Sequence, residues 1–320
     1  MTIFARVLSV VLILMSAIPA GAADDYPSRP VRIIVGFAAG GAPDALARII
    51  ADRMTQRWSQ SVIVENRTGA NGNIAMTAVA KAPPDGYTVA LVPVGNAAVN
   101  PSLFPDLPYD LKQFAPITQI ANVENVLVVS AKSEIKTVAE LIAHGKSRDL
   151  TYATPGAGSI AHLAAELFAR NAGFRVTHVT YRGVTPALTD VLRGEVTMMF
   201  AQVSTAKPLI DSGQLRALGV ASARRSAALP DVPTIIETGM PGFEAVSWYA
   251  LMVPAATPGD VVDRLSAATV RFLASSETRA KLAAQGMDTG GGTPQELAAT
   301  IRAESARWSE VVRKQNIKPE

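Results

Sequence analysis

The residues with the clearest chemical potential lie in two glycine-rich turns, Phe37–Asp44 and Thr154–His162, each expected between a strand and a helix. Glycine lets a backbone approach a ligand closely, and the helix that follows presents unpaired N–H groups at its positive dipole end. Two such turns facing each other across a cleft would clamp a carboxylate without a formal positive charge. Glycine at a tight turn can also serve backbone geometry alone, so neither turn decides the function by itself.

The second turn also contains a dinucleotide-binding pattern, G-x-G-x-x-A, at Gly156, Gly158 and Ala161. That pattern requires an acidic residue about 20 positions later, at the end of the next strand. The expected strand Val176–Tyr181 is followed by Arg182 instead. The sequence therefore argues against a nicotinamide site, and we expect no cofactor.

Catalytic and metal patterns are weak in this chain. Ser159 is not in a G-x-S-x-G nucleophile motif, because the residue two positions later is alanine. His162 follows on the same expected helix, which places its imidazole poorly as a base for Ser159. The three histidines, His144, His162 and His178, fall in separate elements without ligand spacing. We expect no catalytic residue and no metal.

An alternation of strands and helices positions the two turns, which predicts an α/β protein with parallel sheets flanked by helices. The expected strands are Val31–Phe37, Val62–Val64, Thr88–Val92, Asn125–Ser130, Leu150–Ala153, Val176–Tyr181, Val196–Phe200, Leu215–Ala221 and Trp248–Val253. The expected helices are Leu46–Met54, Asn73–Lys81, Val138–Lys146, Ser159–Ala172, Pro186–Leu192 and a tail from Pro258, interrupted at Gly286–Gly292. Two such units with a cleft between them predict a bilobed protein.

The composition sets further limits on the class of protein. The chain has 320 residues, of which 48% are hydrophobic and 18% charged, so it is long enough for two domains and is not intrinsically disordered. It contains no cysteine, which excludes disulfides, cysteine-ligated metals, a cysteine nucleophile and a lipoprotein anchor. The mean hydropathy of +0.21 raises the question of a membrane segment.

The first 22 residues have the features of a cleavable signal peptide. Arg6 precedes the apolar run Val7–Ile18, and Ala20-Gly21-Ala22 supplies a small-x-small cleavage site. The alternative, an uncleaved anchor helix, is disfavoured because the run falls short of about 17 residues. Cleavage lowers the formal charge from +3 to +2, since Arg6 is the only charged residue of the segment. We expect export to the periplasm and no nucleic-acid partner.

With its turns and elements in this order, the chain resembles the Bug family, the periplasmic solute-binding proteins of tripartite tricarboxylate transporters. The likeness covers nearly the whole mature length, and its motifs are specific through their order and spacing. They are Val31–Arg48, Val64–Arg67, Gly69–Asn73, Tyr152–Phe168, His178–Phe200, Gly213–Ser222, Leu229–Thr234 and Trp248–Pro258.

The resemblance implies a type II periplasmic-binding-protein fold with a ligand cleft and a two-strand hinge. It implies a first lobe formed by residues 23–124 and 222–320, and a second lobe formed by residues 125–221. The two glycine-rich turns match the family's pincer loops, which hold a carboxylate through backbone groups and water. The ligand-binding residues that it implies are Phe37, Ala39, Gly40, Gly41, Asp44, Asn96, Ala97, Pro155, Gly156, Ala157, Gly158, Ser159, His162, Tyr181, Arg182 and Gln202.

Some positions depart from the family pattern. Gly36 and Ala39 stand where prolines are usual, and Ala201-Gln202 replaces an Asp-Asn pair. An amino group on the ligand thereby loses an expected partner, and Ala97 and Ala98 remove hydroxyls. These changes favour a less polar carboxylate, aromatic or aliphatic, over an amino acid.

Several side chains have a structural alternative to a binding role. Asp44 either orders the first turn or complements the dipole of its helix. His162 either contacts water in the site or packs locally, and Arg182 either pairs with a second carboxylate or is solvated. We expect Trp248 and Tyr249 to pack in a hinge strand. We expect Trp308 to be core, together with Val311 and Val312.

These features predict a monomeric solute-binding protein that is not an enzyme. It would capture a small carboxylate in the cleft and deliver it to the integral-membrane permease subunits of a tripartite transporter. An alternative is a ligand-sensing role in which the closed form docks on a sensor kinase. An alternative of another class, a secreted hydrolase or oxidoreductase, requires a nucleophile–base pair or cofactor site that we do not find.

Overall fold

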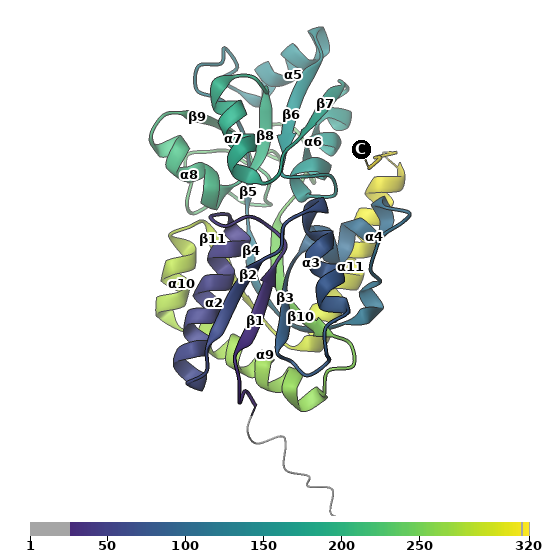
Figure 1. The fold of residues 1–320 in the computed structure, drawn as a ribbon. Helices are drawn as coiled ribbons and strands as arrows, with labels where there is room; N and C mark the ends of the chain where they lie inside the picture. Colours follow the sequence, from purple (N-terminus) through teal and green to yellow (C-terminus); the bar gives the residue numbers. More distant parts are fainter. Residues whose placement is uncertain (1–25, 315, 320) are drawn as a thin grey trace, which may run out of the picture.

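The computed structural model describes residues 26–314 and 316–319, which form two β-sheets, each flanked by helices (Figure 1). The predicted signal peptide, residues 1–22, lies outside the described residues. The α/β class predicted from the sequence is confirmed. In the described part of the chain, no helix is long and apolar enough to span a membrane.

The first sheet has the strand order β11-β4-β10-β3-β1-β2. Its strands are β1 (Val31–Val35), β2 (Val62–Asn66), β3 (Thr88–Pro93), β4 (Phe114–Val123), β10 (Ser247–Pro254) and β11 (Met287–Gly291). Strands β1, β2 and β3 are parallel, whereas β10 runs antiparallel to both β3 and β4, and β11 is antiparallel to β4. The helices around it are α2 (Ala42–Trp58), α3 (Asn73–Ala80), α4 (Asn100–Leu103), α9 (Gly259–Leu273), α10 (Ser276–Ala283) and α11 (Pro294–Lys314).

The second sheet has the order β7-β6-β8-β5-β9. Its strands are β5 (Asn125–Ser130), β6 (Leu150–Thr154), β7 (Val176–Thr180), β8 (Met198–Gln202) and β9 (Leu215–Val220). Strand β6 is parallel to β7 and β8, and β5 is antiparallel to β8 and β9. The helices are α5 (Val138–Ser147), α6 (Ile160–Ala172), α7 (Val184–Arg193) and α8 (Val203–Asp211).

The expectation of parallel sheets is therefore wrong for the sheets as a whole, since both are mixed. The sequence also did not predict β4, β11 and α8. Strand β4 carries Pro116, Gln119 and Asn122 among its apolar residues, and β11 reads Met-Asp-Thr-Gly-Gly, without apolar alternation. Strand β4 forms by pairing with the edge of β10, and β11 forms by pairing with the edge of β4. These partners are distant in the sequence, so local sequence patterns do not reveal the two strands.

Two chain segments cross from one sheet to the other. The first joins β4 to β5 at Glu124, and the second joins β9 to β10 through residues 221–246. Asn125, directly after the first crossing, is hydrogen-bonded to the end of the second crossing. Its Nδ2 donates to the carbonyl of Ala245 at 2.6 Å and to Oγ of Ser247, the first residue of β10, at 3.0 Å. This arrangement suits two lobes that hinge at the crossings. The predicted lobe boundaries at residues 124/125 and 221/222 stay predictions.

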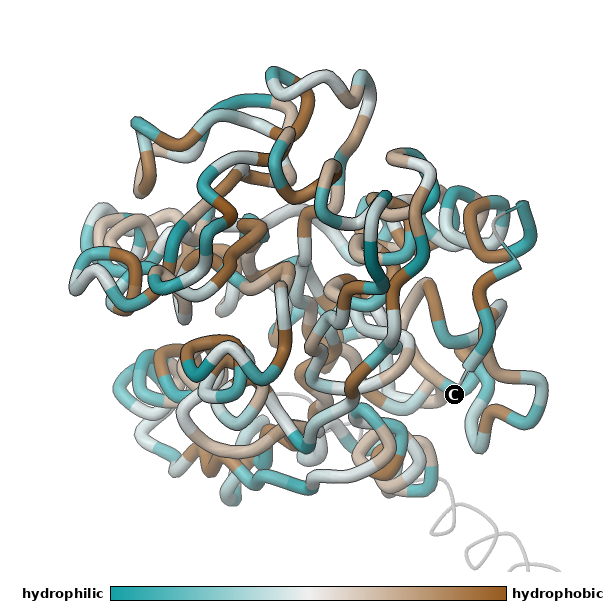
Figure 2. The backbone as a smooth tube through the Cα atoms, turned by 90° about the horizontal axis from the view of Figure 1, so that it is seen from above, coloured by the Kyte–Doolittle hydropathy of each residue, from teal (hydrophilic) through white to brown (hydrophobic). Residues whose placement is uncertain are grey.

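Apolar side chains fill both faces of the first sheet, and the apolar segments run mainly through the interior (Figure 2). Ile33 and Val35 pack with Leu46 on one face, whereas the intervening Ile34 belongs to the core on the other face. A strand that is buried on both faces reads as a continuous apolar run, which explains why the sequence revealed β1. Trp308 is fully buried on α11, so its predicted place in the core is confirmed.

Three aromatic rings lie parallel beneath the loop that joins β6 to α6. His178 is 4.7 Å from Tyr152 and 4.5 Å from His162, measured between ring centroids, with nearly parallel planes. Nδ1 of His162 accepts a hydrogen bond from the N–H of Gly158. Burial lowers the pKa of His162 to about 3, with a smaller effect from His178, and lowers the pKa of His178 to about 4. Both rings are therefore neutral in the folded protein at neutral pH.

These two histidines predict a loss of stability in acid. Above about pH 6.5 both are neutral in the folded and unfolded chain. As the pH falls toward 4, the unfolded chain binds protons that the folded chain does not, so the free energy of unfolding decreases by up to about 1.4 kcal/mol per pH unit for each histidine. Urea unfolding of the wild type and of His162→Gln at pH 7.5 to 4.5 measures this slope, which should be shallower in the variant.

His144 on α5 lies outside this group of rings and provides the matched control. The variant His144→Gln should retain the wild-type slope. An equal flattening of the slope in both variants would contradict the role given to the ring group.

Candidate functional site

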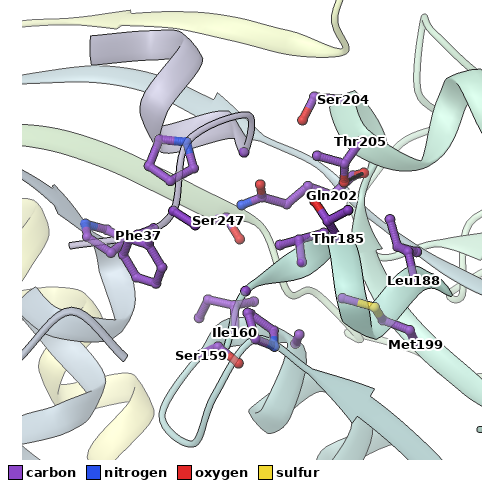
Figure 3. A pocket seen from close by; sticks show the side chains of 18 of the residues that line it. Phe37, Ser159, Ile160, Thr185, Leu188, Met199, Gln202, Ser204, Thr205 and Ser247 are labelled. Atoms are coloured by element: carbon purple, nitrogen blue, oxygen red, sulfur yellow. Dashed lines mark hydrogen bonds between the residues drawn. The ribbon is translucent and has the colours of Figure 1, made fainter. Parts of the chain in front are cut away.

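A cavity of about 770 Å³ is lined by both sheets' loops and by helices of the second sheet (Figure 3). From the first sheet come the β1–α2 loop, the turn after β3 and β10 residues. From the second come the β6–α6 loop, the start of α7, the end of β8 and the start of α8. Its lining residues include Phe37, Gly40, Gly41, Ser159, Ile160, Thr185, Leu188, Met199, Gln202, Ser204, Ser247 and Tyr249.

The β1–α2 loop is held in shape by the buried carboxylate of Asp44. That carboxylate accepts from the N–H of Gly40 at 3.1 Å, from Arg48 through two bonds of 2.9 and 3.0 Å, and from Asn66 at 3.0 Å. Asn66 also donates to the carbonyl of Phe37. Burial alone would raise the pKa of Asp44, but the hydrogen bonds from Arg48, Asn66 and Gly40 outweigh it and leave the pKa below its ordinary value. Asp44 thus positions the loop.

The β6–α6 loop is fixed by its own side chains. Oγ1 of Thr154 accepts from the N–H of Gly156 at 3.1 Å, and Oγ of Ser159 accepts from the N–H of His162 at 3.2 Å as the N-cap of α6. Gly158 has φ of +79°, and a Cβ there would lie 2.2 Å from Oδ1 of Asn100. This position therefore requires glycine for both its backbone conformation and its surroundings.

The two loops direct two helix N-termini at the same cavity. Helix α2 has 17 residues and begins after Gly41, and α6 has 13 residues and begins after Ser159. The N–H groups of Ile160 and Ala161, at the first two positions of α6, have no acceptor within their helix, and both residues line the cavity. Unpaired N–H groups and the positive dipole ends attract a negative charge.

The loops of the two lobes are in direct contact. Nδ2 of Asn71, in the 3₁₀ turn η1 (Ala70–Gly72), donates to the carbonyl of Ala157 at 2.7 Å. In the π-helical turn η2 (Gly95–Val99), a Cβ at Gly95 would lie 2.7 Å from the carbonyl oxygen of Gly158. These contacts hold the two lobes together across the mouth of the β6–α6 loop.

The cavity walls carry almost no charge. Arg182, which is exposed, is the only ionisable side chain other than Tyr249 among the lining residues. The walls are otherwise apolar, amide or hydroxyl. In the described part of the chain, no three His, Asp or Glu residues are grouped to hold a metal ion.

The structure brings nine of the sixteen predicted site residues to the cavity wall: Phe37, Ala39, Gly40, Gly41, Asn96, Pro155, Ser159, Arg182 and Gln202. The other seven are absent from the lining: Asp44, Ala97, Gly156, Ala157, Gly158, His162 and Tyr181. Among these seven, Asp44, Gly158 and His162 bond within the loops, Ala97 is fully buried, and the hydroxyl of Tyr181 donates to Asp190 at 2.7 Å. Direct ligand contact by any of the sixteen stays a prediction.

Sequence reasoning missed part of the second lobe's wall and the contribution of β10. Thr185, Leu188 and Met199 line the cavity from α7 and β8. Ser247 and Tyr249 line it from β10, where Tyr249 was expected only to pack. The sequence of β10 could have indicated this, because Ser247 and Tyr249 are two positions apart on an otherwise apolar strand. Their hydroxyl-bearing side chains therefore lie on the same face of the sheet.

Comparisons with known proteins agree with this geometry. The model of the tripartite tricarboxylate transporter family receptor matches residues 46–317. The structure of R. palustris Rpa4515 with adipate is 38% identical with a TM-score of 0.89, covering 92% of this chain and 100% of that chain. MatC from Rhodopseudomonas palustris with bound malate is 33% identical with a TM-score of 0.85, covering 90% and 100%. The periplasmic binding protein BugD is 32% identical with a TM-score of 0.87, covering 92% and 100%.

These neighbours confirm the predicted two-lobed periplasmic-binding-protein fold. The family match spans most of the chain. It includes most of α2, which follows the first glycine-rich loop, the whole of the second loop and the strands β4, β5, β9 and β10. The chain belongs to the family of tripartite tricarboxylate transporter receptors.

Proposed function

We propose that this protein is a periplasmic solute-binding protein that captures a small carboxylate between its lobes and delivers it to the membrane subunits of a tripartite transporter. The observation that carries the proposal is the convergence of two helix N-termini, one from each lobe, on one cavity. A carboxylate placed there accepts from N–H groups of both loops, so it favours the closed arrangement of the lobes.

The relatives support an organic acid as the class of ligand. Rpa4515 was solved with adipate and MatC with malate, and both share the fold over nearly their whole length. The family's description as a transporter receptor supports delivery to a membrane partner. The signal-like segment at residues 1–22 supports a periplasmic location.

The local geometry favours binding over hydrolysis. Nδ1 of His162 already accepts from the N–H of Gly158, and the ring lies parallel to His178. Ser159 serves as the helix cap, with its Oγ accepting from the backbone N–H of His162. This pair therefore lacks the hydrogen bond from hydroxyl to imidazole that activates a serine nucleophile.

Calorimetry against a panel of mono- and dicarboxylates tests this function. A second assay asks whether each bound ligand is recovered chemically unchanged, which tests for the absence of turnover. We expect at least one carboxylate to bind, and the variant Gly158→Ala to weaken it by more than about tenfold, because the new Cβ meets Asn100 and the loop must move. Binding of no carboxylate in the panel would contradict the proposed function.

Gly173 is the matched control for Gly158. Its φ of +76° imposes the same backbone strain on alanine, but a Cβ there meets nothing within 4 Å. Gly173→Ala should therefore keep the wild-type dissociation constant. If both variants lose affinity equally, the loop assignment fails.

The hydrogen bond between Asn71 and Ala157 predicts a second effect, on closure. Asn71→Gly removes the donor while keeping a residue that tolerates φ of +49°. We expect about threefold to tenfold weaker ligand binding, as for the loss of one net hydrogen bond, mainly through faster dissociation. We also expect a larger radius of gyration for the ligand-free protein in X-ray scattering.

Asn316 has the same φ of +49° and is exposed near the C-terminus, so Asn316→Gly is the control. It should change neither the dissociation rate nor the radius of gyration. A wild-type dissociation rate in Asn71→Gly would show that this bond does not stabilise the closed lobes.

A further inference from the structure

Two side chains on the cavity wall have hydrogen-bonding capacity that the protein does not use. Gln202 ends β8, and its Nε2 donates to Oη of Tyr249 on β10 at 2.5 Å. Its Oε1 is buried and has no partner. Both residues line the cavity, and the Gln202 amide extends toward its middle (Figure 3).

The hydrogen-bonding character of this pair does not depend on the orientation of the amide. In the orientation described, Oε1 of Gln202 remains as an acceptor and the hydroxyl proton of Tyr249 remains as a donor. If the amide is turned by 180°, Nε2 of Gln202 becomes the donor to the cavity and Oη of Tyr249 the acceptor. In both cases the pair offers at least one donor and at least one acceptor.

The surroundings keep this pair neutral. Tyr249 retains its proton at neutral pH because burial raises the pKa of its hydroxyl to about 12, despite the hydrogen bond from Gln202. No Asp, Glu, Lys or His side chain lines the cavity, and Arg182 is exposed. Oγ of Ser204, two residues after Gln202, is another buried group without a partner.

A charged group fits this position poorly. A second carboxylate can only accept, so it would leave an acceptor of the pair facing an anion. An ammonium group would lack an anionic partner. A hydroxyl or a primary carboxamide both donates and accepts, and it satisfies the pair in either orientation.

Part of the cavity wall that the second sheet contributes is apolar. Leu188 from α7, Met199 from β8 and Leu209 from α8 line the cavity on the side of the second sheet. A volume of about 770 Å³ is within the range of pockets that hold ligands larger than a four-carbon acid. The part of the ligand that spans this wall is therefore expected to be hydrocarbon, alkyl or aryl.

We propose that Gln202 and Tyr249 form a second anchor, which binds a neutral hydroxyl or carboxamide at the far end of a carboxylate with an apolar body. This inference rests on the proposed function, since the glycine-rich loops hold the carboxylate. The residues would select against amino acids and dicarboxylates of the same length.

A set of six-carbon acids that differ only at the far end tests the anchor. Calorimetry compares 6-hydroxyhexanoate and the monoamide of adipate with hexanoate, 6-aminohexanoate and adipate, and the set is repeated with four and eight carbons. At the best length we expect the hydroxyl and amide compounds to bind at least tenfold more tightly than the other three, because those leave the buried pair unsatisfied or face it with a charge.

Two variants locate this preference. In Gln202→Leu and in Tyr249→Phe, the ratio of dissociation constants between hexanoate and 6-hydroxyhexanoate should fall to within about twofold of one. Gln119→Leu is the matched control, because Gln119 bonds Asn122 on β4 and is absent from the cavity lining. It should keep the wild-type ratio.

The outcomes separate the two proposals. Binding without preference, tighter binding of adipate or 6-aminohexanoate, or an unchanged ratio in Gln202→Leu would overturn the anchor and leave carboxylate binding in place. Failure of every acid in every set to bind would overturn the proposed function and the anchor with it.

Discussion

An anion in this cavity meets no buried cation, and the rest of the site depends on that constraint. Apart from the exposed Arg182 and neutral hydroxyl and amide donors, the groups that balance its negative charge are backbone N–H groups and helix dipoles. These N–H groups must point into the cavity, so the conformation of each loop is fixed by a side chain that does not line the cavity. The carboxylate of Asp44 accepts from the N–H of Gly40, and His162 accepts from the N–H of Gly158. The positioning residues thus matter as much as those at the wall.

Close packing between the lobes is the second requirement. The carbonyl of Ala157 accepts from Asn71, and the carbonyl oxygen of Gly158 lies so near Gly95 that Gly95 has no room for a side chain. Gly158 itself has no room for one because the side chain of Asn100 lies against it. One lobe supplies α2 and the other α6, and the two dipoles converge in the arrangement that has these contacts. Closure and anion binding are therefore coupled by geometry.

Local features of this protein could be predicted from the sequence, and pairings between distant segments could not. The glycine-rich loops and the strand β1 are visible because glycines before a helix and a continuous apolar run are local signals. Strand β11 has no such signal and exists because β4 presents an edge to it. The same holds for Gln202 and Tyr249: their hydrogen bond joins residues of different sheets, so no spacing in the sequence reveals it.

The position of β10 in the first sheet also sets an order of assembly. A chain made from its N-terminus contains all five strands of the second sheet by residue 220. The first sheet lacks the strand between β3 and β4 until residue 254, and its β11 edge until residue 291. Until then, β3 and β4 expose unpaired backbone groups that other chains can pair with. A truncated or interrupted copy of this protein would therefore carry a finished second lobe attached to a first lobe prone to aggregation.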